Sequence, residues 1–345
     1  MIEKKLWGSL PDGREISLYR LTNKWGEYAE FLDYGASLHS LYLLDGAGKL
    51  GDVVLGVEGP QGLQGSTTEG ATVGRCASRI ADGRFVIDGK VFQLEKGSGG
   101  HCLHSGSSNF ARQLFQARLE EEENKITFLL RDLGSCGYEC AVEAEVSFTF
   151  DDEHRLIIEY CMTPEGDTVL SPTNHAYFNL GCQDARDHLL TIHGSSCAAK
   201  SERGLPEGEI KSVKDTPLDF TGRRSIGQAM ESGPVDLVKG APGYDESYII
   251  DGTGFREAAQ LYCPQSGRYM KVETDMPCLV LFVSKFSEQK PGKAGRIYEG
   301  YASVCLETEY VPNAVNCTAF EKPVFHAGQV MRSRTVYAFG CVQED

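Results

Sequence analysis

The sequence predicts an all-β protein, a large β-sandwich or a related double sheet, and three observations support this fold class. Short runs that alternate apolar and polar residues recur along the chain, which is typical of strands with one buried face. Most of the 39 glycines stand between these runs, where turns need positive φ angles. No long segment repeats its apolar residues with the 3.6-residue period of a helix, so we expect little helix.

The individual strands can be placed from their patterns. Residues 85–94 hold two apolar runs separated by Asp88–Gly89, a two-residue signal for a β-hairpin. Residues 141–150 alternate strictly, and residues 155–162 return after a polar turn. Further strands are predicted at 125–130, 246–250, 259–263, 269–274, 278–286, 303–310 and 335–340. The polar stretch 200–243 is the least regular part, and we expect long loops or short helical turns there.

The composition describes a globular chain with a large core. Of its 345 residues, 41% are hydrophobic and 24% are charged. No repeat of fixed period, low-complexity tract or interdomain linker interrupts the chain. We therefore expect residues 1–345 to form a single domain.

The charge and the N-terminus restrict partners and location. A formal net charge of −15 argues against non-specific nucleic-acid binding. Residues 1–15 have no apolar run after their lysines, and no segment approaches the length of a transmembrane helix. We therefore expect no signal peptide, no contact with a membrane and a cytoplasmic location.

The 12 cysteines are irregularly spaced, and no Cys-x-x-Cys occurs. Without a secretory signal, we interpret them as reduced thiols, many of them buried as small hydrophobic side chains. A zinc site stays open as an alternative, although the spacing does not match the common zinc-binding patterns. No motif for a nucleotide or redox cofactor is present, so the prediction is neither metal nor cofactor.

The segment "SPTNHAYFNLG", residues 171–181, places a histidine among small polar residues and then aromatic ones. Side chains alternate between the two faces of a strand. One face would then carry small and apolar side chains suited to a core, namely Ala176, Phe178 and Leu180. The other would carry an imidazole, a phenol and an amide, namely His175, Tyr177 and Asn179. That second face suits a ligand with many hydroxyls, although a strand half exposed to water would look the same.

Four other places hold polar side chains that could take part in binding or catalysis. They are Arg79 ahead of the 85–94 hairpin, His101 and His104 between glycines, Asp245 and Glu246 ahead of an apolar run, and Glu307 and Glu309 on one strand face. Each has an ordinary interpretation as a solvated charge, a turn residue or an outward strand position. The His-x-x-His spacing could also bind a metal, but a glycine-rich loop does not fix the required geometry.

These motifs follow one another in the order found in a known family. "SRIADGRFVIDGKVFQL", "LHSG", "TNHAYFNLG", "YDESYII" and "CLETEYVPNAVN" carry the likeness, which extends nearly from end to end. On these motifs the sequence resembles the aldose 1-epimerases, also called galactose mutarotases. The resemblance implies the galactose mutarotase-like supersandwich fold and an isomerase that interconverts the α and β anomers of an aldose.

The resemblance also implies a role for individual residues. Arg79 and Asp245 would bind sugar hydroxyls, and His104 would lie against the sugar. His175 matches the usual general acid, and Glu307 matches the usual general base. These residue types suit the reaction independently, because opening a cyclic hemiacetal needs one group to accept a proton and another to donate one. We expect the acidic limb of the pH profile to come from the carboxylate and the basic limb from His175.

Several positions depart from the family pattern. Ser78 stands where the family often has Asn, His101 where Asn is common, and Val280 where a Gln contacts sugar. Glu246 replaces a His that often follows the Asp, and Glu309 stands where Gln is frequent. These changes remove amide groups and add a carboxylate near the cleft, so we expect an altered or broadened sugar preference. The acid–base pair is unaffected, and we do not expect Glu309 to be the base.

Three alternatives remain. A non-catalytic carbohydrate-binding protein on the same fold would need no intact acid–base pair. A glycoside hydrolase would use two carboxylates, but Glu307 and Glu309 lie on one strand and so on one side of a bond. A sugar-phosphate 1-epimerase needs extra basic residues at the cleft, for which Arg112, Arg223 and Arg224 are the candidates. As partner we expect a small monosaccharide, which the sequence does not identify, and we expect a monomer or weak homodimer.

Overall fold

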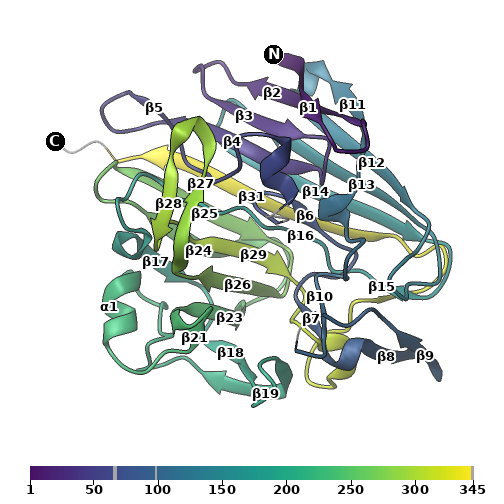
Figure 1. Cartoon of the computed structure of the whole chain (residues 1–345). Coiled ribbons are helices and arrows are strands. Elements are labelled where there is room, and N and C mark those ends of the chain that lie inside the picture. The colour runs from purple at the N-terminus through teal and green to yellow at the C-terminus, as the bar shows by residue number, and fades with distance from the viewer. Residues whose placement is uncertain (65–67, 98, 343–345) are drawn as a thin grey trace.

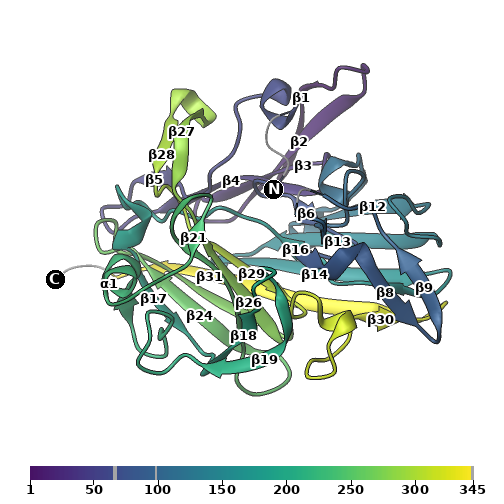
Figure 2. The same ribbon diagram turned by 60° about the horizontal axis from the view of Figure 1, so that its bottom comes forward.

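The structure is a computed structural model that describes residues 1–64, 68–97 and 99–342. Strands dominate these ranges, and three antiparallel sheets lie in two layers (Figures 1 and 2). This architecture confirms the predicted all-β sandwich.

A nine-stranded sheet forms one layer. Its strands, in spatial order, are β11 (Gln116–Glu120), β12 (Lys125–Asp132), β13 (Val142–Phe150), β14 (Arg155–Pro164), β31 (Met331–Cys341), β25 (Arg268–Thr274), β24 (Arg256–Tyr262), β17 (Leu189–Ile192) and β20 (Arg224–Ser225). The strict alternation expected for residues 141–150 is confirmed in β13, whose apolar side chains are all buried.

Two five-stranded sheets form the other layer. The N-terminal sheet has the order β1 (Ile2–Ser9), β2 (Glu15–Thr22), β3 (Tyr28–Leu32), β4 (Ser37–Leu44) and β5 (Leu50–Asp52). The second, which we call the site sheet, has the order β19 (Pro206–Ser212), β18 (Ser196–Lys200), β23 (Tyr244–Ile249), β26 (Cys278–Val283) and β29 (Cys305–Glu309). One continuous group of buried apolar side chains contacts all three sheets, so the main core lies between the two layers.

Short two-stranded ladders fill the edges. They are β6 (Thr72–Val73) with β16 (Thr173–Asn174), β7 (Arg79–Ile80) with β10 (Cys102–Leu103), β8 (Arg84–Ile87) with β9 (Lys90–Gln93), β15 (Thr168–Val169) with β30 (Val324–Phe325), β21 (Leu237–Val238) with β22 (Ala241–Pro242), and β27 (Phe286–Pro291) with β28 (Ile297–Gly300). The hairpin predicted at Asp88–Gly89 is confirmed between β8 and β9, and both turn residues have the positive φ that such a turn needs. The irregular stretch 200–243 contains β19 and the short helix α1 (Ile226–Glu231).

The segment around Phe178 joins the two five-stranded sheets. Phe178 forms single-residue bridges to Val54 on one side and to Val304 on the other. It exchanges backbone hydrogen bonds of 2.9 and 2.8 Å with Val304, and Asn179 donates to the Val53 carbonyl at 2.8 Å. The regular strand ends at Asn174, so the expectation of a continuous strand over 171–181 is wrong. The segment instead forms single-residue bridges to Val54, just after β5, and to Val304, just before β29.

The expected division of this segment into two faces is confirmed. Ala176, Phe178 and Leu180 are buried in the main core. His175 and Tyr177 belong to the other face, where their rings stack 4.9 Å apart. They too are almost fully buried, so the half-exposed strand is wrong.

Candidate active site

Five residues predicted from the sequence converge from three parts of the fold. Arg79 lies in β7, and His104 directly follows β10, the partner of β7. His175 directly follows β16, while Asp245 and Glu307 lie in β23 and β29 of the site sheet. Figure 1 shows β16, β29 and the β7–β10 ladder grouped at one end of the site sheet.

The centre of the site is a pair of buried ionisable side chains. Nε2 of His175 lies 3.5 Å from Oε2 of Glu307. The side chains are 7% and 4% exposed, so neither is screened by bulk water. Burial lowers the pKa of His175 well below 6.5, and the neighbouring His104 adds to this effect. Burial, with the nearby carboxylates Glu309 and Asp245, raises the pKa of Glu307 well above 4.5.

His104 is held in one orientation by the backbone of Ser78, the residue just before β7. The N–H of Ser78 donates to Nδ1 of His104 at 3.1 Å, and the N–H of His104 donates to the Ser78 carbonyl at 2.8 Å. Because Nδ1 accepts, the proton of the neutral ring resides on Nε2. Burial lowers the pKa of His104 to about 4, and Arg79 adds to this. His104 is thus a neutral hydrogen-bond donor near pH 7, with its ring centre 5.7 Å from that of His175.

Arg79 and Asp245 form the more open side of the site. Nη1 of Arg79 lies 3.3 Å from Oδ2 of Asp245, and the two side chains are 37% and 29% exposed. Together with Ser78, Ser247 and Val280 they line a small pocket. A guanidinium and a carboxylate that remain accessible can donate to and accept from the hydroxyls of a sugar.

Val280 lines the small pocket from the site sheet, on the strand between β29 and β23. It lies across the sheet from Glu307 on one side and from Ser247 on the other. It is buried and presents no hydrogen-bonding group to the pocket. The sequence departure at this position therefore lies beside Glu307.

Glu309 shares the strand face of Glu307 but has an unusual environment. It is fully buried, and neither of its carboxyl oxygens has a hydrogen-bond partner among the described residues. Burial raises the pKa of Glu309 to about 8, with Asp245 adding to the shift. Near pH 7 its carboxyl group is therefore mostly protonated and neutral, much like the amide of a glutamine.

Two further departures have structural roles. Glu246 is buried and forms an ion pair with Lys200, whose Nζ lies 2.6 Å from Oε1 of Glu246. Nζ of Lys200 also lies 2.7 Å from Oδ2 of Asp236, and Lys200 lines the small pocket. The sequence did not indicate this position at the pocket, because Lys200 lies at the start of the irregular stretch. Nδ1 of His101 accepts from the N–H of Asp82 at 3.1 Å.

A larger cleft adjoins the site. It has a volume of about 630 Å³ and is lined by Thr68, Tyr177, Lys239 and Phe286, among others. Tyr177 stacks on His175, and Nζ of Lys239 lies 5.3 Å from the ring centre of Phe282. Phe282 also packs edge-on against His175 at 6.0 Å, so the cleft lies beside the ring of His175. The sequence analysis did not identify Lys239.

The basic residues considered for a sugar phosphate lie elsewhere. Arg223 and Arg224 line a separate cleft with Asp215 and Asp219. Arg112 ends a short 3₁₀ turn and is exposed. None of these three arginines lines the small pocket or the 630 Å³ cleft.

Side chains close enough together to hold a metal ion occur in two groups within the described ranges. One contains Cys182, His188 and Cys263, and the other contains Asp88, Asp167 and His326. Neither group includes a candidate active-site residue, and the His101–His104 pair belongs to neither. Of the helices in the described part of the chain, none is both long and apolar enough to cross a membrane.

Comparison with known proteins identifies the family to which this chain is similar. The family model for aldose 1-epimerase matches residues 17–338. The aldose 1-epimerase of Escherichia coli K12 is 29% identical, over 95% of this chain and 96% of its own length. The galactose mutarotase of Bos taurus is 30% identical, over 98% of each chain. A crystal structure of a GalM/aldose epimerase homologue from C. elegans superposes with a TM-score of 0.86 at 27% identity, covering 94% of this chain and 98% of that one. The chain belongs to the aldose 1-epimerase family.

Proposed function

We propose that the protein is an aldose 1-epimerase in which Glu307 and His175 exchange protons with a bound sugar. The observation that carries this proposal is the buried contact of 3.5 Å between Nε2 of His175 and Oε2 of Glu307. Arg79 and Asp245 stand beside this pair as groups that can hold hydroxyls. A protein that only bound sugar would not need two titratable groups buried against each other, because their burial lowers stability and groups perturbed in this way are typical of active sites.

The reaction moves two protons and breaks one bond of the sugar. Glu307 accepts the proton of the anomeric hydroxyl, while the protonated imidazole of His175 donates to the ring oxygen. The bond between the anomeric carbon and the ring oxygen breaks, and the open-chain aldehyde forms. Rotation of the aldehyde exposes its other face, and the two proton transfers then run backwards to close the ring as the other anomer.

The pair needs one proton in total to begin this cycle. That proton is on His175 before ring opening and on Glu307 after it, so both arrangements must be accessible. Burial disfavours the charged pair, and the shifts of both pKa values favour the neutral arrangement with the proton on Glu307. The two groups therefore titrate as a unit, and the pH limits of activity belong to the pair.

This inverts the pH assignment expected from the sequence. Below the lowered pKa of His175 the pair holds two protons, and above the raised pKa of Glu307 it holds none. Only the state with one proton is active. Because the favoured one-proton state of the pair carries its proton on Glu307, the acidic limb follows protonation of His175 in that state and the basic limb follows loss of the Glu307 proton.

The remaining residues orient the sugar. His104 is neutral near pH 7 and donates through Nε2, while the open Arg79–Asp245 pair binds hydroxyls. The substrate class is a small monosaccharide, and no residue of this scheme calls for a metal or a redox cofactor. The net charge of −15 supports a protein that does not bind nucleic acid, and we further propose a cytoplasmic monomer or weak homodimer.

The test is anomer exchange measured by NMR over a panel of aldoses and one hexose phosphate. Exchange well above the spontaneous rate supports the proposal. Saturable sugar binding without faster exchange would instead establish the carbohydrate-binding alternative. Acceleration confined to the hexose phosphate would support the sugar-phosphate alternative.

A further inference from the structure

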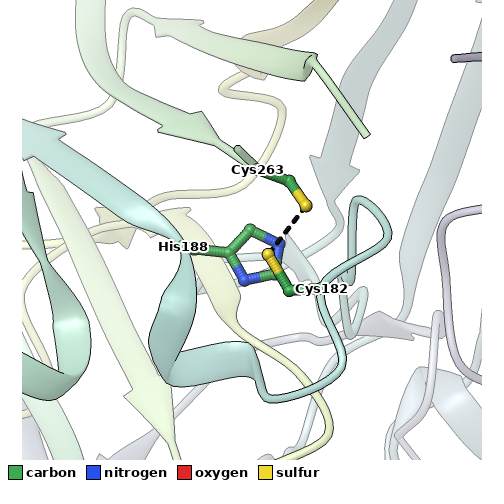
Figure 3. A group of neighbouring side chains, drawn as sticks. All are labelled: Cys182, His188 and Cys263. Atoms are coloured by element: carbon green, nitrogen blue, oxygen red, sulfur yellow. Dashed lines mark hydrogen bonds between the residues drawn. The ribbon is translucent and has the colours of Figure 1, made fainter. Parts of the chain in front are cut away.

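A pair of cysteines lies outside the site and is unused by the chemistry above. Cys182 follows the Phe178 segment, and Cys263 begins the turn between β24 and β25, 81 positions further along the chain. Their Sγ atoms lie 2.7 Å apart, and both side chains are buried. Figure 3 shows the two sulfurs facing each other beside the ring of His188.

From this geometry we infer that Cys182 and Cys263 are a redox modification site that closes to a reversible disulfide when a small peroxide reaches it. A disulfide has an S–S bond of about 2.05 Å, so the sulfurs need to approach by only about 0.7 Å. Bridging would link the segment that follows His175 to the nine-stranded sheet. The same two segments are already joined there, because Oγ of Ser266 and Nη1 of Arg268 both donate to the Leu180 carbonyl, at 2.6 and 3.1 Å.

A metal site is the competing interpretation, and two observations argue against it. Two thiolates on one tetrahedral zinc ion would stand about 3.8 Å apart, which is farther than these sulfurs. His188 has both ring nitrogens in use: Nδ1 contacts the Ala185 carbonyl at 2.8 Å, and Nε2 accepts from the N–H of Leu180 at 3.1 Å. Binding a metal would break one of these buried hydrogen bonds.

The two sulfurs have different roles in the reaction. The thiol of Cys182 donates toward Cys263 and lowers the pKa of Cys263 to about 6, with Ser266 adding to the effect. The pKa of Cys182 is raised by the same contact and by burial. Cys263 is therefore the attacking thiolate, and Cys182 is the thiol that resolves the intermediate.

The atoms and electrons balance with hydrogen peroxide as the oxidant. The Cys263 thiolate attacks one peroxide oxygen, the O–O bond breaks, and hydroxide leaves, so Cys263 becomes a sulfenic acid. The sulfur of Cys182 then attacks the sulfenic sulfur. The S–S bond forms, the S–O bond breaks, and the hydroxyl group leaves as water with the proton of Cys182. Burial of both sulfurs favours a small oxidant over a bulky disulfide.

The test treats the reduced whole protein with one equivalent of hydrogen peroxide at pH 7.5. Free thiols are then alkylated, and the peptides are mapped by mass spectrometry. We expect a peptide cross-linked through Cys182 and Cys263, formed about tenfold faster than oxidation of an ordinary thiol because a pKa near 6 makes Cys263 mostly thiolate. Dithiothreitol should reverse it. The oxidised protein should melt about 5 °C higher than the reduced one.

Matched variants keep the test decisive. Cys182→Ser and Cys263→Ser should each abolish the cross-link and the rise in melting temperature. Cys161→Ser, on the distant strand β14, should retain both. Absence of the cross-link in the wild-type protein would overturn the inference. So would one tightly bound zinc per chain, after equilibration with zinc, that is lost in both variants. None of these measurements depends on anomer exchange.

Discussion

Burial decides which protonation states the active site can hold, and this is where individual residues matter most. His104, His175, Glu307 and Glu309 all sit where charge is disfavoured, and their pKa values move accordingly toward the neutral forms. Two carboxyl groups on one strand face thereby acquire different roles. Glu307 has an imidazole within reach, whereas neither oxygen of Glu309 has a hydrogen-bond partner within the described ranges.

Replacing each carboxyl by an amide separates these roles. Glu307→Gln keeps the size of the side chain but cannot accept a proton, so kcat should fall by about 10² to 10⁴ with little change in KM. Glu309→Gln replaces a mostly neutral group by another neutral group and should cost less than about tenfold. Anomer exchange rates of both variants, measured side by side, test this. A near-normal Glu307→Gln beside an inactive Glu309→Gln would reverse the assignment.

The pH profile of kcat/KM provides an independent measurement. In the wild-type protein the acidic limb should lie below 6.5, since the pKa of His175 is lowered, and the basic limb should follow Glu307. Glu309→Gln removes a carboxyl group whose ionised form, present once the pH rises past about 8, raises the pKa of Glu307, so its basic limb should move to lower pH. In Glu307→Gln the basic limb should be lost. A basic limb that stays unchanged in both variants would exclude Glu307 as its source.

Val280 bears on sugar preference. A buried apolar side chain beside Glu307 cannot form a hydrogen bond with a sugar hydroxyl. The wild-type protein should therefore discriminate weakly among aldoses that differ in the hydroxyl next to Val280. Val280→Gln should change the relative kcat/KM among aldoses by about tenfold or more. Leu237→Gln, which replaces a side chain that is 70% exposed, is the matched control. Sharp galactose selectivity in the wild-type protein would contradict this.

Among the elements, the Phe178 segment is the one that sequence patterns describe least well. Its two faces could be assigned, because alternation alone determines which side chains point inward. Its pairing could not, because it bonds to Val54 and Val304, which are far from it in the sequence. The strands with strict alternation, such as β13, and the β8–β9 hairpin were predictable because neighbouring residues determine them.

Phe178 should matter for stability as well as for activity. It is fully buried, and its ring packs edge-on against Tyr337 at 5.0 Å. Phe178→Ala should lower the free energy of unfolding by about 3–5 kcal/mol. The displaced segment also carries His175, so kcat should fall. Thermal melting and exchange assays test both effects, with Phe255→Ala, at a side chain 47% exposed, as the control. An unchanged melting temperature would be incompatible with this packing.

At the scale of the whole molecule, one core contacts all three sheets. We therefore propose that the chain unfolds as a single domain, as its composition and lack of linkers led us to expect. Differential scanning calorimetry should show one transition whose calorimetric and van't Hoff enthalpies agree. Two resolved transitions would mean that the N-terminal sheet and the site sheet are separate cooperative units.

The site illustrates what a sequence can and cannot indicate at this scale. The motifs identified Arg79, His104, His175, Asp245 and Glu307, and the fold brings all five together. Lys200 and Lys239 escaped notice because they lie in the irregular stretch without a motif of their own. The pH limits that we propose could not be predicted either, because they depend on burial, which only the assembled sheets create.

Phe178 bridges Val54, just after the last strand of the N-terminal sheet, and Val304, just before β29 of the site sheet, and His175 lies three positions before it. The imidazole is thus anchored by the hydrogen bonds that make the layer continuous. In the proposed mechanism, where His175 and Glu307 each exchange a proton with the sugar, the surrounding backbone dipoles would need little rearrangement, because the fold already fixes them. The reorganisation energy of the proposed proton transfers and the continuity of the two-sheet layer would therefore both depend on the backbone hydrogen bonds of the Phe178 segment. A substitution that weakens these hydrogen bonds should therefore lower the rate of anomer exchange as well as the stability of the fold.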